Sequence, residues 1–100
     1  MRFRMEFPDF PVEDMPQIPA GFEDWSWHND ACPSFTDESR RLRLWIDYRE
    51  PEKRDLAGAH RFMLTRLTSE RDPDEYEDVL TESDDYSEIL EAIASHSTQE

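Results

Sequence analysis

His28 and Cys32 are the side chains best suited to metal or nucleophile chemistry in this sequence. A structural zinc site needs about four such ligands, and no second pair of cysteine or histidine residues lies close to these two. Cys32 could also be a nucleophile with His28 or His60 as its base, since the partners need only meet in space. No further motif supports either chemistry, so we expect a buried thiol beside a partly exposed imidazole.

Closely spaced carboxylates at Asp72, Asp74 and Asp78 could hold a hard cation such as Ca²⁺. The calcium-loop pattern is not met, because its sixth position is Glu77 instead of glycine and its twelfth is Ser83 instead of glutamate. A carboxylate pair of the kind that glycosidases use means little where acids are so abundant. A glycine-rich phosphate loop does not fit a chain with two glycines. We therefore predict a non-enzymatic protein with no catalytic residue, metal or cofactor.

The chain of 100 residues has the length of one domain, and 36% of its residues are hydrophobic. Aromatic residues make up 12%, and their large rings can supply a modest core. A lone cysteine fits a reducing compartment, and no apolar run is long enough to cross a membrane. We expect a single domain over residues 1–100 in the bacterial cytoplasm, with an arm over 1–21, a sheet over 22–82 and a helix over 83–96.

Acidic residues outnumber basic ones by 25 to 11, which gives a net charge of −14. Such a chain repels nucleic acid phosphates and anionic membranes, so we expect a basic DNA-binding protein as its partner and no direct contact with either. Eight of the eleven bases lie between residues 40 and 69, where they suit internal pairing with the acidic ends or self-association. The predicted partner-binding residues are acids of the C-terminal third: Glu70, Asp72, Asp74, Glu75, Glu77, Asp78, Asp84, Asp85, Glu88 and Glu91.

Residues 6–21 are rich in proline, which removes backbone donors and disfavours helix, so we expect an extended arm that lies on the domain's own core. Residues 42–48 and 60–67 alternate in polarity, the pattern of half-buried antiparallel strands. A short strand is expected near Trp25 and an edge strand over 76–80. The predicted fold class is α+β, with a small antiparallel sheet of three to five strands packed against a C-terminal helix.

From Ser83 onward the apolar spacing changes to that of a helix. Ser83 is the expected N-cap, and acids in the first turn suit the positive end of the helix dipole. The inward face is expected to hold Tyr86, Ile89, Leu90 and Ile93. The opposite face is expected to present Asp84, Glu88 and Glu91 in an outward row.

Trp25, Trp27 and Trp45 could stack on bases or fill a pocket of a partner. In a domain this small we expect them mainly in the core, with Trp45 partly exposed because it falls on the strand face opposite Leu44 and Ile46. An alternative function follows from the same residues. The chain would then be a non-enzymatic bacterial adaptor that docks through aromatic and proline-rich surface, with its acids serving only solubility.

The small size, the lack of catalytic motifs and the acids clustered between Glu70 and Glu91 resemble the acidic inhibitors encoded by phages and mobile elements, which include DNA mimics and anti-CRISPR proteins. The resemblance covers the last third of the chain and its overall composition. Residues 21–35 (GFEDWSWHNDACPSF) also resemble a recurring segment of small bacterial proteins, which implies no activity. The first resemblance implies an anti-CRISPR inhibitor that blocks DNA recognition by electrostatic occupancy of a basic site on a CRISPR effector subunit.

Overall fold

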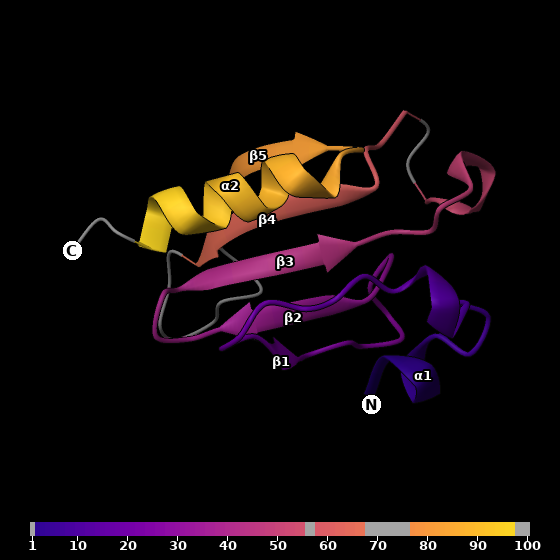
Figure 1. Cartoon of the computed structure of the whole chain (residues 1–100). Coiled ribbons are helices and arrows are strands. Elements are labelled where there is room, and N and C mark those ends of the chain that lie inside the picture. The colour runs from indigo at the N-terminus through magenta and orange to yellow at the C-terminus, as the bar shows by residue number, and fades with distance from the viewer. Residues whose placement is uncertain (1, 56–57, 68–76, 98–100) are drawn as a thin grey trace.

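The structure, a computed structural model, describes residues 2–55, 58–67 and 77–97. Five antiparallel strands form one sheet in the order β1-β2-β3-β4-β5, with a helix near each end of the chain (Figure 1). The strands are β1 (Glu23–Asp24), β2 (Ser34–Asp37), β3 (Leu42–Ile46), β4 (Phe62–Leu67) and β5 (Glu77–Ser83). The helices are α1 (Arg2–Glu6) and α2 (Tyr86–Ser97), and short 3₁₀ turns span Val12–Asp14 and Pro51–Lys53. The predicted α+β class is confirmed.

The alternation of β3 divides its side chains between the two faces of the sheet. Leu44 pairs with Leu64 and Ile46 with Phe62 across the β3–β4 ladder, and all four side chains are buried. Trp45 pairs with Met63 and therefore faces the other side, because successive side chains of a strand alternate. The two segments predicted from polarity alternation are thus neighbouring antiparallel strands, as expected.

One face of the sheet carries the whole hydrophobic core. Helix α2 lies against β4 and β5, and the N-terminal segment runs across the other half of the sheet on the same side (Figure 1). The core consists of Phe3, Phe7, Phe10, Phe35, Leu42, Leu44, Ile46, Tyr48, Phe62, Leu64, Ile89 and Ile93. Among the described residues, no helix covers the opposite face of the sheet.

The segment 1–21 is only partly the extended arm that the sequence predicts. It does lie on the domain's own core, with Phe3, Phe7 and Phe10 buried, but α1 and a 3₁₀ turn lie within it. Helix forms before the first proline, Pro8, where the proline restriction on backbone geometry does not apply. Phe3 is further held by its backbone N–H, which donates to Asp24 Oδ2 at 2.8 Å.

The boundaries of β1, β5 and α2 differ from the predicted ones by a few residues. The sheet covers 23–83 rather than 22–82, and α2 begins at Tyr86 rather than Ser83 and extends to Ser97. Asp85 caps the helix instead of Ser83, since its Oδ1 accepts the Ser87 N–H at 2.9 Å. Ser83 is the last residue of β5 and pairs with Phe62.

The inward face of α2 is narrower than the sequence predicts. Ile89 and Ile93 are buried and Tyr86 packs against the core, but Leu90 is 41% exposed. A helix lying on the last strands of a sheet contacts them along one stripe, and Leu90 falls at its solvent side. No helix in the described part of the chain has the length and apolar composition needed to cross a membrane.

Candidate functional site

The structure describes six of the ten predicted partner-binding acids. Glu70, Asp72, Asp74 and Glu75 lie outside the described residues, and Glu77 is the first residue of β5. The remaining five are all exposed, and we call them the acidic C-terminal surface: Asp78, Asp84, Asp85, Glu88 and Glu91.

Asp84 is exposed but takes part in holding the fold together. Its Oδ1 accepts the backbone N–H of Arg61 at 2.8 Å and lies 3.6 Å from His60 Nδ1 and 3.8 Å from Arg54 Nη1. The Arg61 N–H hydrogen bond is the main reason that the pKa of the Asp84 carboxyl lies below its usual value. This carboxylate therefore ties the segment before α2 to the start of β4.

Asp85 and Glu88 are occupied by the start of α2. Asp85 accepts hydrogen bonds from the Ser87 hydroxyl and N–H, which lower the pKa of its carboxyl. Glu88 Oε2 accepts a hydrogen bond from the Ser83 hydroxyl. In the predicted outward row of Asp84, Glu88 and Glu91, only Glu91 thus makes no hydrogen bond or ion pair with another described side chain.

The basic middle of the chain is used largely for internal pairing. Arg40 Nε donates to Asp37 Oδ2 at 2.5 Å, and Arg43 Nη2 lies 3.4 Å from Asp30 Oδ2. Arg54 donates to three backbone carbonyls, and its side chain is 6% exposed. These contacts agree with the predicted pairing of bases with the acidic ends.

The uncovered face of the sheet is centred on Arg43 and Trp45. Arg43 is 2% exposed, and its guanidinium carbon lies 4.0 Å from the centroid of the Trp45 ring. Its Nε and Nη2 donate to Ser34 Oγ on β2 at 3.2 and 3.0 Å. The expectation that the tryptophans lie mainly in the core is wrong, because Trp25 and Trp45 are half-buried and Trp27 is 43% exposed. The core side of the sheet is filled by phenylalanine and aliphatic side chains instead.

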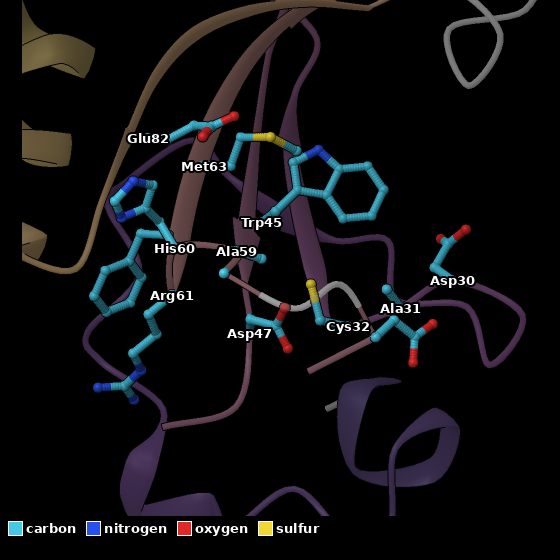
Figure 2. Close-up of a pocket in the computed structure, with 13 residues that line it drawn as sticks. Asp30, Ala31, Cys32, Trp45, Asp47, Ala59, His60, Arg61, Met63 and Glu82 are labelled. Carbon is cyan, nitrogen blue, oxygen red and sulfur yellow. The ribbon is translucent and has the colours of Figure 1, made fainter. Parts of the chain in front are cut away.

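A cavity of about 500 Å³ opens at one end of this uncovered face (Figure 2). Trp45 and Met63 form its sheet side, and the loops around Cys32 and His60 form its other walls. Figure 2 shows the Asp47 carboxylate beside the Cys32 sulfur. The cavity is not predictable from local sequence patterns, because its walls come from four separate segments.

Burial raises the pKa of both titratable side chains at the centre of this cavity, Cys32 and Asp47. Burial, with the nearby charges of Asp47 and Asp30, raises the pKa of the Cys32 thiol, so the sulfur stays protonated and unreactive at neutral pH. Burial also raises the pKa of the Asp47 carboxyl, although the hydrogen bond from the Tyr48 N–H opposes this shift. The cysteine is a buried thiol, as expected.

His28 does not lie with Cys32 in a metal site. Its Nδ1 lies 2.9 Å from Glu6 Oε1, and the same oxygen accepts the His28 backbone N–H. Within the described ranges, no three His, Cys, Asp or Glu residues are grouped to hold a metal ion. Comparison with known proteins gave no match to a protein family, a curated protein or a solved structure.

Proposed function

We propose that this protein binds a basic DNA-binding protein through the acidic C-terminal surface and blocks DNA recognition, without catalysing a reaction. The observation that supports this proposal is that the fold engages arginine side chains in internal contacts more fully than it engages the acids of the C-terminal surface. Arg40, Arg43 and Arg54 are tied to internal carboxylates and carbonyls. All five acids of the surface are exposed, and two of them, Asp78 and Glu91, make no such contact with another described side chain. Exposed negative charge that the fold does not neutralise can attract the Lys and Arg side chains of a partner.

The dimensions are compatible with occupation of a DNA site. The protein measures 38 × 28 × 25 Å and carries a net charge of −14. Duplex DNA about 30 Å long carries on the order of 18 negative charges. A partner that contacts this surface would use the same side chains that otherwise contact phosphates. The narrower proposal of a CRISPR effector subunit as the target rests on the resemblance in size and composition to anti-CRISPR proteins.

Charge reversal tests the proposal if it avoids acids with an internal role. Asp78→Lys with Glu91→Lys changes two exposed carboxylates of the surface, and neither accepts a hydrogen bond from another described side chain. Glu13→Lys with Glu23→Lys is the matched control, because both residues are exposed and far from α2 in sequence while the change in net charge is identical. Circular dichroism would establish that both variants are folded.

The assay begins with capture of partners from a bacterial lysate on the immobilised protein, elution by a salt gradient, and competition between the captured protein and duplex DNA. We expect the surface variant to lose about tenfold or more in affinity, and the control to lose less, since charge complementarity is local within a Debye length. Equal losses would show that net charge alone acts, and unchanged affinity would remove the surface from the mechanism.

A second candidate function is supported by the exposed aromatics. Trp27 is 43% exposed, and the centroid of its ring lies 4.2 Å from that of His28. These two rings offer a surface through which a non-enzymatic adaptor could dock on a partner. The proline-rich segment contributes less to such docking than expected, because Phe3, Phe7 and Phe10 are buried in the protein's own core. Salt separates the two candidates, since aromatic docking weakens little with ionic strength. A partner that stays bound at high salt and is lost on Trp27→Ala would favour the adaptor.

A further inference from the structure

We propose that the cavity on the uncovered face of the sheet binds an organic cation, namely a guanidinium or primary ammonium group carried on a short aliphatic chain. This site lies on the face of the sheet away from α2 and does not depend on the acidic C-terminal surface. Its volume of about 500 Å³ is within the range of small-ligand sites.

The charge of the lining selects a cation. Asp30, Asp47, Asp55 and Glu82 all line the cavity. Arg61 also lines it, but its guanidinium extends away from the other labelled side chains, and its Nη2 donates to the backbone carbonyl of Asp14 (Figure 2). Asp30 already lies 3.4 Å from Arg43 Nη2, so the lining carboxylates that a cation would meet are chiefly those of Asp47, Asp55 and Glu82.

Asp47 is the residue that marks the cavity as a site. It is 8% exposed, and its Oδ1 accepts the backbone N–H of Tyr48 at 2.8 Å. Its second carboxylate oxygen has no hydrogen-bond donor among the described residues. This oxygen is open to the cavity, where water can reach it, and the nearby charge of Arg54 also favours the ionised carboxylate. A cation donor in the cavity would take the place of that water, and the burial that raises the pKa of the Asp47 carboxyl would strengthen its attraction to a cation.

The remaining walls favour a carbon chain behind the charged head. Trp45, Met63 and Cys32 present apolar surface to the cavity, which suits a carbon chain. The carboxylates that line the cavity are too widely spaced for a metal ion, since no three metal-ligating side chains are grouped together among the described residues. Planar guanidinium groups match carboxylates in a two-donor geometry, which makes them the better of the two head groups.

The test uses n-butylguanidinium and n-butylammonium as probes and n-butanol as their neutral analogue. Binding is followed by the chemical shift of the Trp45 indole N–H, which donates to Thr65 Oγ1 at 3.4 Å. We expect saturable binding of both cations, with the guanidinium tighter, and no saturation with butanol. Asp47→Asn should weaken cation binding about tenfold or more, since it removes a charge while retaining the shape of the side chain.

Two further variants keep the result decisive. Glu82→Gln at the exposed rim should also weaken the cation, and it guards against misfolding of the Asp47 variant; Glu23→Gln on β1 is the control and should bind as the natural protein does. Equal binding of butanol and the cations, or unchanged cation affinity in folded Asp47→Asn, would overturn the proposal. A blocked arginine peptide distinguishes the source: binding tighter than that of the free probe assigns the site to an arginine of a protein partner, and weaker binding assigns it to a small amine.

Discussion

Arg43 and Trp45, two residues apart on β3, lie on the same face of the sheet with the guanidinium carbon 4.0 Å from the centroid of the Trp45 ring. The pair sits on the face that no helix covers in the described part of the chain, yet Arg43 is 2% exposed. Contacts with Ser34 and Asp30 satisfy its charge from neighbouring segments. The face opposite the core therefore has a polar, aromatic packing of its own.

Removal of this guanidinium should destabilise the protein. Loss of one partner from a fully buried ion pair costs about 3–5 kcal/mol, and the cost of Arg43→Ala should be somewhat lower, about 2–3 kcal/mol, because the Asp30 side chain is 31% exposed. Arg43→Lys should fall in between, since it keeps the charge but not the forked donors. Urea unfolding measures both. Arg49→Ala, at an exposed position, is the control, and a loss equal to its value would contradict the assigned role.

The N-terminal segment should behave as part of the domain and not as a removable arm. Phe3 is 0% exposed and contacts the rings of Phe10 and Phe35, with centroids 5.9 and 6.4 Å away. Phe3→Ala should therefore cost about 3–5 kcal/mol of the free energy of unfolding. Met5 on the same helix is 77% exposed, so Met5→Ala should change it by less than about 0.5 kcal/mol. Similar unfolding midpoints for the two variants would show that the segment does not contribute to the core.

The sequence predicts the central strands and the C-terminal helix well because local periodicity determines them. Leu42, Leu44 and Ile46 alternate with Arg43 and Trp45, and this aliphatic period of two is sufficient to predict that the three aliphatic side chains share the inward face. The predicted start of α2 at Ser83 is wrong because Ser83 and Asp85 are both good caps by residue type. Only the pairing of Ser83 with Phe62 in the sheet decides between them.

The features of the uncovered face depend on long-range packing and were not predicted. The alternation along β3 predicts that Trp45 and Leu44 point to opposite faces of the sheet. It does not predict that α2 and the N-terminal segment both pack on the face that carries Leu44. The cavity beside Asp47 likewise requires segments distant in sequence to meet. Trp45 on β3 and Met63 on β4 each alternate with core residues along their strand. This alternation predicts that both point to the uncovered face, where they form the apolar wall of the cavity.

Gly21 should resist substitution for two separable reasons. Its φ of +94° is unfavourable for other residues, and a Cβ there would lie 2.6 Å from Asp37 Oδ2 and 3.1 Å from Arg40 Nη2. Gly58 has a similar φ of +82° with no atom within 4 Å of its would-be Cβ, so it is a matched control. We expect Gly58→Ala to cost about 1–2 kcal/mol from the backbone alone, and Gly21→Ala to cost more in urea unfolding. Equal losses of unfolding free energy in the two variants would show that the Asp37 side chain moves aside for the new Cβ without destabilising the fold.

The turn that joins β2 and β3 should make stability depend on pH through Asp37. Burial by itself would raise the pKa of the Asp37 carboxyl, but hydrogen bonds from Arg40 Nε and from the Ser39 hydroxyl outweigh it and lower that pKa below its usual value. The folded state therefore binds this proton less readily than the unfolded state does. The stabilisation is fully present above the unfolded pKa, about 4, and is lost as the pH falls through the lower folded pKa.

The free energies of unfolding of the natural protein and Asp37→Asn, compared from about pH 6 down to about pH 3, test this dependence. Their difference should be constant near neutral pH and should shrink below about pH 4, because the protonated carboxyl and the amide both lack the charge that Arg40 requires. Ser39→Ala removes one donor to Asp37 Oδ1, so it should raise the folded pKa and move the loss to higher pH. A difference that stays constant over the whole range would mean that the ionised carboxylate of Asp37 gives the fold no more than a neutral amide does.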